Sequence, residues 1–347
     1  MVEGAAGMDD SVGPPASHPR KTLLKQWLED LSAFHHVLLL CSAPCSIFLL
    51  ISLFFTRLWF LSVLYLTWLY LDRNTPSQGG RRLDCLRSWS MWKHQRDYFP
   101  IKLVKTAELP PDKKYLLVTH PHGIMSYGLL CNFVSESNNF SQHFPGIKLW
   151  IAMMSLFFYV PGFREYVMSQ GLRPVSRPSL DFILSQPQLG LAVAIVPGGA
   201  HEAMYAAPGQ NCLKLENRKG FVRLALSHGA SLVPVYSFGE NDIFKCLTFA
   251  KGSWQYQIQI ICKKLTRIAP CIFWGRSLFL PNSWGLLPLP RPITTVVGAP
   301  IHVPQLSTPT EEQVDHYHRL YLEALERLFE EHKESCGISA STHLTYC

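Results

Sequence analysis

The chain has 347 residues, of which 48% are hydrophobic and only 16% are charged. Soluble domains are about one quarter charged, so this deficit indicates that some of the surface lies in lipid. The formal net charge of +7 suits anionic lipid headgroups or a substrate that carries phosphates. Nucleic acid is excluded as a partner, because the chain has no Lys/Arg-rich block and no aromatic-basic motif.

The chain begins with a polar segment, residues 1–33. Within it, residues 1–20 are rich in Gly, Ala, Ser and Pro and are predicted to be disordered. The segment is not a secretory signal, because Asp9 and Asp10 lie where basic residues belong and no apolar core follows closely. The 10 cysteines are scattered without the spacing of a disulfide framework, which indicates reduced thiols and a cytosol-facing globular domain.

Residues 34–71 are predicted to form a membrane-embedded helical hairpin. Their apolar core, 37–71, contains a single charged side chain, Arg57. As one helix this core would run about 52 Å, whereas the hydrocarbon layer of a bilayer is about 30 Å thick. We therefore expect a break near 55–57 and two helices of about 17 residues each. Two full spans, a re-entrant hairpin and a buried helix pair of a soluble protein are the alternatives.

Basic residues flank both ends of this region, and they are Lys21, Lys25, Arg73, Arg81, Arg82 and Arg87. The positive-inside rule then places both termini in the cytosol. The glycosylation sequon Asn139-Phe140-Ser141 would face the cytosol as well and stay without glycan.

Residues 72–347 alternate between strand and helix patterns, which predicts an α/β fold with a mainly parallel sheet and flanking helices. The expected strands are 115–119, 191–196, 231–236 and 293–297, and the expected helices are 123–135, 179–186 and 218–228. A further apolar stretch, 149–160, is too short to span a bilayer and belongs to the core or to the membrane interface. The C-terminal helix should begin at a capping box in 308–311, with Pro309 in its first turn, and end before Gly337.

The tetrapeptide His120-Pro121-His122-Gly123 follows the first expected strand. Histidine is the side chain best suited to proton transfer near neutral pH, so a histidine where a strand opens into a loop is a candidate general base. A purely structural role and a metal site are the alternatives. The sequence disfavours the metal site, because no third ligand follows at a zinc-site spacing.

A second loop, Pro197–Glu202, follows the strand 191–196. The amides of Gly198 and Gly199 can face a negative oxygen, and Glu202 can orient a catalytic histidine. A plain tight turn is the alternative for this loop.

Two more polar segments accompany the strand 231–236. The basic residues before it, Arg218, Lys219 and Arg223, form either a phosphate-binding set or a solvated helix face. Glu240 and Asn241 follow the strand in a third polar loop. Because ligands bind where the carboxyl ends of parallel strands meet, we expect these loops to form one site.

Six segments together carry a family resemblance, and they are Tyr98–Pro100, His120–Gly123, Pro197–Glu202, Arg218–Phe221, Phe238–Asn241 and Gly298–Ile301. They resemble the type-2 diacylglycerol acyltransferases, a family that includes monoacylglycerol and wax-alcohol acyltransferases. Residues 107–111, 185–190 and 330–336 are similar to its monoacylglycerol branch. Glu216 and Ser277 depart from the basic residue and the glycine that relatives commonly have. The first departure bears on acyl-CoA contacts near Arg218.

The resemblance implies acyl transfer from acyl-CoA to a lipid hydroxyl at the endoplasmic reticulum membrane, by a glycerol-phosphate-acyltransferase-like domain. The implied acceptor is 2-monoacylglycerol, with diacylglycerol or a long-chain alcohol as alternatives. Acyl-CoA is a co-substrate, and no cofactor or metal is expected. A non-enzymatic lipid-droplet scaffold is the rival interpretation, whereas a lipid hydrolase would need a G-x-S-x-G elbow that the chain lacks. Lipid-droplet association and a homo-oligomer stay open.

The resemblance also implies roles for residues. His122 takes the place of the catalytic histidine of glycerol-phosphate acyltransferases, with His120 as its support. The acidic residue that follows in those enzymes is replaced here by the segment Met125–Tyr127, so Glu202 is the candidate for the orienting carboxylate. The other roles are the oxyanion loop (Gly123, Gly198, Gly199), acyl-CoA binding (Arg218, Lys219, Arg223) and the substrate-site loop (Glu240, Asn241).

Overall fold

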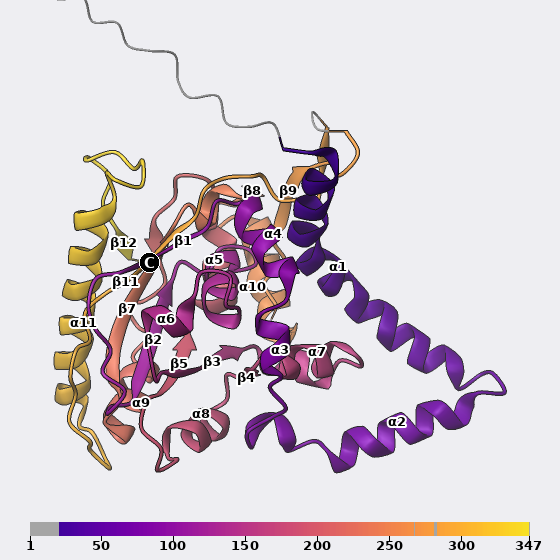
Figure 1. Ribbon diagram of the computed structural model, residues 1–347, viewed down its shortest axis with the longest axis horizontal. Coiled ribbons are helices and arrows are strands. Elements are labelled where there is room, and N and C mark those ends of the chain that lie inside the picture. Colours follow the sequence, from indigo (N-terminus) through magenta and orange to yellow (C-terminus); the bar gives the residue numbers. More distant parts are fainter. Residues whose placement is uncertain (1–20, 267, 281–282, 347) are drawn as a thin grey trace, which may run out of the picture.

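The computed structural model describes residues 21–266, 268–280 and 283–346, and the predicted disorder of 1–20 lies outside them. At its centre is a seven-stranded sheet (Figure 1). Its strands in spatial order are β1 (Lys102–Lys105), β11 (Thr294–Val297), β7 (Ser231–Phe238), β2 (Tyr115–His120), β5 (Leu191–Ile195), β3 (Lys148–Met153) and β4 (Leu172–Pro174). All neighbours are parallel except β11 and β7. The predicted mainly parallel α/β fold is therefore confirmed.

The expected strand 293–297 is present as β11, but it runs antiparallel to β7. Its first residue, Thr294, pairs with Phe238, the last residue of β7. The chain thus re-enters the sheet at the edge where β7 left it, which forces the opposite direction.

Helices cover both faces of the sheet. They are α8 (Arg177–Leu184), α9 (Gly220–His228) and α11 (Glu311–His332) on one face, and α4 (Ser90–Tyr98), α6 (Phe140–His143) and α7 (Phe163–Ser169) on the other. Within β2, Leu116 and Val118 pack into the α8–α9–α11 layer, whereas Tyr115 and Leu117 pack into the opposite one. Every residue of β2 is buried, as expected for a parallel strand covered on both faces.

Other expectations hold only in part. The predicted helix 123–135 is reduced to α5 (Tyr127–Leu129) and a π-helix, Leu130–Val134, because Ser126 before them is left-handed. The stretch 149–160 is β3 and a short 3-10 turn that buries Phe158, so it belongs mainly to the core. The sequence did not indicate β1, β4, α4, α6 or α7. It also did not indicate η1 (Thr75–Ser77), α3 (Asp84–Arg87), η3 (Ser155–Tyr159), η4 (Gly199–Tyr205), β6 (Cys212–Leu213), η5 (Glu240–Asp242), β8 (Lys245–Leu247), α10 (Trp254–Thr266), β9 (Ile272–Arg276), β10 (Trp284–Gly285) and β12 (Thr345–Tyr346).

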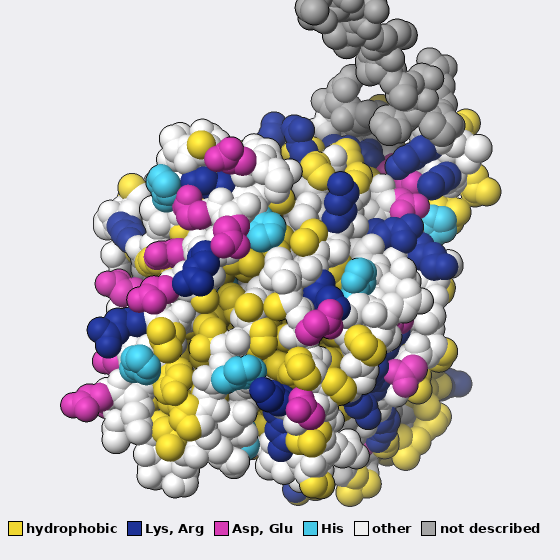
Figure 2. Space-filling view, turned by 60° about the vertical axis from the view of Figure 1, so that its left-hand side comes forward, with side chains coloured by type: hydrophobic (Ala, Val, Ile, Leu, Met, Phe, Trp, Pro, Cys, Tyr) yellow, Lys and Arg dark blue, Asp and Glu magenta, His cyan; other side chains and the backbone are white. Residues whose placement is uncertain are grey.

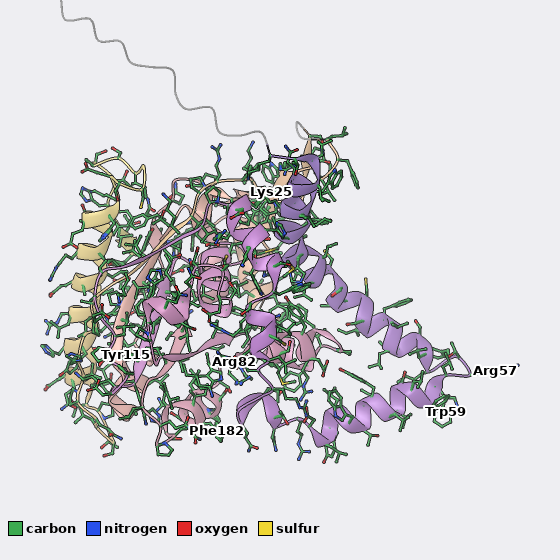
Figure 3. The ribbon with its side chains drawn as sticks, viewed as in Figure 1. Lys25, Arg57, Trp59, Arg82, Tyr115 and Phe182 are labelled. Atoms are coloured by element: carbon green, nitrogen blue, oxygen red, sulfur yellow. The ribbon has the colours of Figure 1, made fainter. Side chains whose placement is uncertain are left out.

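Two N-terminal helices project from this body, α1 (Leu23–Leu53) and α2 (Trp59–Leu71). They meet at a turn whose tip carries Arg57, far from the sheet (Figure 3). Only α1 among the described helices is long and apolar enough to cross a membrane, and α2 with its 13 residues covers about 20 Å. Large apolar side chains such as Phe48 (72% exposed) and Phe55 (87% exposed) point outward. In a helix pair of a soluble core, such side chains would be buried.

The start and the lengths of these helices differ from the prediction. The helix begins at Leu23 instead of residue 34, because Thr22 caps it by accepting a hydrogen bond from the Lys25 amide. The N-terminal half of α1 packs on α4 and buries Ala33 and Val37. The two helices are therefore unequal in length, and the beginning of the longer one, α1, packs on the globular body.

The C-terminal helix α11 begins two positions later than predicted. The Thr310 hydroxyl accepts from the Gln313 amide at 3.3 Å, and the Gln313 side chain accepts from the Thr310 amide at 2.9 Å. The capping box is therefore Thr310–Gln313, and Pro309 precedes the helix. The helix ends at His332, before Gly337, whose φ is +81°.

We predict that Thr310→Ala lowers the free energy of unfolding by about 1 kcal/mol, because it removes the cap of α11. Thr308→Ala serves as the matched control and should leave stability unchanged. Chemical denaturation of the detergent-solubilised protein measures both. A larger effect at Thr308 would contradict the observed cap.

Candidate active site

Three loops meet at the carboxyl edge of the sheet, as the sequence predicted. β2 lies between β7 and β5, so the loop after β2 is flanked by the loops after its two neighbours. Glu202 follows β5, Glu240 follows β7, and both carboxylates reach the loop that begins at His120. The site is thus built around the central strand.

His122 is the partly exposed histidine of this loop. Its Nδ1 lies 2.9 Å from the Gly123 carbonyl oxygen. Because a carbonyl can only accept, the hydrogen-bond network assigns the proton to Nδ1 and leaves the lone pair on Nε2. Burial lowers the pKa of His122, and the bond to Gly123 raises it in part. The side chain is therefore neutral near pH 7 and can accept a proton at Nε2.

His120 is fully buried and has a different environment. Its Nε2 lies 3.0 Å from the hydroxyl of Tyr321 on α11, and this hydroxyl donates to the Val118 carbonyl at 3.1 Å. Burial lowers the pKa of His120 to about 3. His120 therefore connects the loop to α11 and cannot meet a substrate.

Glu202 does not contact the imidazole of His122. One carboxylate oxygen accepts from the His122 backbone amide at 2.9 Å, and the other accepts from the Lys214 amide at 2.9 Å. The imidazole nitrogen that lies close to the carboxylate is Nδ1 of His120, at 3.9 Å. Burial raises the pKa of Glu202 to about 7, although the two amides act in the opposite direction. Glu202 thus fixes the loop backbone, and the tautomer of His122 is set by Gly123 instead.

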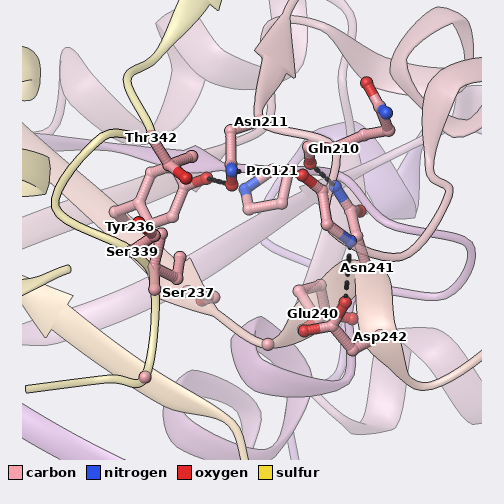
Figure 4. A pocket seen from close by; sticks show the side chains of 14 residues that line it. Pro121, Gln210, Asn211, Tyr236, Ser237, Glu240, Asn241, Asp242, Ser339 and Thr342 are labelled. Carbon is pink, nitrogen blue, oxygen red and sulfur yellow. Dashed lines mark hydrogen bonds between the residues drawn. The ribbon is translucent and has the colours of Figure 1, made fainter. Parts of the chain in front are cut away.

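Glu240 fixes the other end of the same loop. Its oxygens accept from the backbone amides of Tyr127 at 2.7 Å and Gly128 at 2.8 Å. Burial raises its pKa to about 7 as well. Gly123, with a φ of +60°, packs against it so closely that a Cβ would lie 2.8 Å from the Glu240 side chain. Glu240 is a positioning residue, and its side chain, although buried, also lines the polar cavity beside the loop (Figure 4).

The two glycines of the second loop have different roles. The Gly199 amide donates to the Val196 carbonyl at 3.1 Å, so it is engaged within its own loop and does not face outward as the sequence predicted. At Gly198 an added Cβ would collide with the Glu202 carboxyl group. Gly198 therefore makes room for the carboxylate that holds His122.

Two of the three predicted acyl-CoA contacts are engaged elsewhere. Lys219 pairs with Asp315 at 2.6 Å, and Arg223 pairs with Glu311, both on α11. Acidic and basic side chains are accordingly interspersed on the face turned forward in Figure 2. These ion pairs join α9 to α11, whereas Arg218 is exposed and has no ionic partner among the described residues.

Asn241 lines a polar cavity of about 250 Å³ beside the loop (Figure 4). Its amide nitrogen donates to the Gln210 carbonyl at 2.8 Å, and Pro121 and the C-terminal residues Ser339 and Thr342 complete the wall. His122 does not line this cavity, so Asn241 does not lie directly at the candidate base.

Two tyrosines of the site escaped sequence reasoning. The Tyr127 hydroxyl donates to the Ala33 carbonyl of α1 at 2.7 Å, and the Tyr321 hydroxyl contacts His120. Both lie in apolar patterns that predict only core packing. A buried tyrosine hydroxyl needs a hydrogen-bond partner, and this requirement is the one feature of the sequence that could have indicated these contacts.

We predict that Gly198→Ala lowers activity about 100-fold, because displacing Glu202 releases the His122 amide and shifts the base. Gly220→Ala is the control, since an added Cβ there meets nothing within 4 Å. Acyl transfer in membranes with matched expression measures both. Equal activity of the two variants would show that Glu202 does not position the loop.

The chain is similar to several known proteins. The family model described as diacylglycerol acyltransferase matches residues 51–346. The chain is 61% identical to human 2-acylglycerol O-acyltransferase 3, over 98% of this chain and 99% of that protein. It is 50% identical to diacylglycerol O-acyltransferase 2 of Danio rerio, over 86% and 83% of the two chains, and 47% identical to the human protein of that name, over 92% and 82%. The chain belongs to the diacylglycerol acyltransferase family.

Proposed function

We propose that this protein transfers the acyl group of acyl-CoA to 2-monoacylglycerol and forms diacylglycerol. The observation that carries the proposal is the neutral His122, with Nε2 unprotonated, where three strand-end loops meet. The similarity to a protein named 2-acylglycerol O-acyltransferase 3 supports this acceptor. Diacylglycerol is the second acceptor, because relatives named diacylglycerol O-acyltransferase 2 are also similar.

The reaction needs a base because a lipid hydroxyl is a weak nucleophile. Nε2 of His122 takes the hydroxyl proton while the oxygen attacks the thioester carbonyl. The tetrahedral intermediate collapses, the C–S bond breaks, and the CoA thiolate leaves and receives the proton from His122. No covalent acyl-enzyme and no further cofactor take part. With the Gly199 amide engaged, the Gly198 amide is the remaining candidate of that loop for stabilising the oxyanion.

The fold and the membrane segment complete the proposal. The domain after residue 71 is of the glycerol-phosphate acyltransferase type. Helices α1 and α2 leave the globular body and return to it (Figure 1). In this proposal, the part that projects dips into the endoplasmic reticulum membrane. Basic flanks on both sides support cytosolic termini.

This topology predicts that Asn139 carries no glycan in the full-length protein expressed in cells. Its side chain is exposed, so the sequon would be accessible to the transferase if it faced the lumen. Glycosidase treatment followed by a mobility assay tests this point. A glycan at Asn139 would place the active site in the lumen.

We predict that His122→Ala lowers acyl-CoA-dependent diacylglycerol formation about 100-fold or more, because the base is lost. His316→Ala, on the exposed surface of α11, is the matched control and should retain full activity. The assay uses membranes with equal amounts of each variant. Retention of more than about a tenth of the activity would exclude His122 as the base.

A further inference from the structure

A group of basic side chains surrounds His201, close to the active-site loop. The group, called here the His201 cluster, consists of His201 on η4, Lys214 after β6, Arg218, Lys251 before α10, and Lys263 on α10. Lys263 Nζ contacts His201 Nδ1 directly. Burial, and then repulsion from the four cations, lowers the pKa of His201 to about 4. Three segments of the chain, which contain Lys214 and Arg218, Lys251, and Lys263, thus bring positive charges to one place beside His201.

These cations form no ion pair with an acidic side chain among the described residues, although the charge of Arg218 acts to lower the pKa of Glu202. Lys219 and Arg223 nearby in sequence are paired with carboxylates of α11, but no ion pair engages Lys214, Arg218, Lys251 or Lys263. Repulsion from Arg218 and Lys214 adds to burial in lowering the pKa of Lys263. An uncompensated group of like charges is costly to fold, and a ligand with several negative charges would offset this cost.

The His201 cluster is joined to the catalytic loop by a single carboxylate. The Lys214 amide donates to one oxygen of Glu202, and the His122 amide donates to the other, each at 2.9 Å. The Tyr205 ring lies between cluster members, with its centroid 5.7 Å from that of His201 and 5.9 Å from Lys251 Nζ. A ligand held at the cluster therefore lies beside the loop that carries the base.

We propose that the His201 cluster binds the phosphate groups of the acyl-CoA donor. The proposal rests on the proposed function and deepens it. CoA carries a pyrophosphate and a 3′-phosphate, joined to the thioester by a long flexible arm. Phosphates held at the cluster leave this arm to extend toward His122. Arg218 keeps the role that the sequence predicted, whereas Lys214, Lys251 and Lys263 take the place of Lys219 and Arg223.

The test compares two acyl donors that share one thioester. Oleoyl-CoA carries the phosphates, and oleoyl-pantetheine lacks them. The double variant Lys214→Gln/Lys263→Gln should raise KM for oleoyl-CoA about 100-fold or more, because it removes two charged contacts to phosphate. The kcat, the KM for monoacylglycerol and the rate with oleoyl-pantetheine should stay unchanged.

Two controls keep the result interpretable. Lys264→Gln removes a charge from an exposed position of the same helix and should behave as the wild type. Lys214→Arg/Lys263→Arg keeps the charges and should restore a low KM for oleoyl-CoA, which separates lost charge from lost fold.

Three outcomes would overturn the proposal. An unchanged KM for oleoyl-CoA in the Gln variant excludes the cluster as the phosphate site. An equal loss with both donors assigns the cluster to the lipid headgroup or to the fold. A wild-type protein that transfers oleate from neither donor contradicts the proposed function itself. This outcome is distinct from the other two, because they concern the Gln variant of an active protein.

Discussion

Two buried carboxylates hold the catalytic loop from both sides, and the rest of the site depends on them. Glu202 comes from the strand on one side of β2 and Glu240 from the strand on the other, and each accepts two backbone amides. Removing a carboxylate from water is costly, and these four hydrogen bonds offset that cost. The carboxylates thereby stabilise the backbone of the loop, and the imidazole of His122 stays open to a substrate.

The sequence predicted which loops would meet but not what their side chains would contact. Strand-end position placed His122, Glu202 and Glu240 together, because adjacent parallel strands end at one edge. Whether the Glu202 carboxylate contacts the His122 imidazole or the His122 backbone amide depends on distances of a few ångströms. The sequence pattern does not determine such distances. The ion pairs of Lys219 and Arg223 escaped prediction for another reason, since their partners on α11 are distant in sequence.

Helix α1 connects the candidate membrane segment to the globular body that carries the candidate active site. Its N-terminal half packs on the globular body, and the Tyr127 hydroxyl, in the segment held by Glu240, donates to the Ala33 carbonyl. The apolar second half of the same helix is exposed. The helix is therefore both a candidate anchor and a packing partner of the segment that Glu240 holds, so a boundary at residue 34 divides a single structural element.

The contact between each glycine and its glutamate constrains how the site can change. Gly123 leaves room for Glu240, and Gly198 leaves room for Glu202. A larger residue at either glycine is compatible only with a shorter acid opposite, and a shorter acid no longer reaches its amides unless the loop moves. A substitution at either glycine therefore requires a compensating substitution at the glutamate that it contacts. We expect the two residues of each pair to change together in evolution.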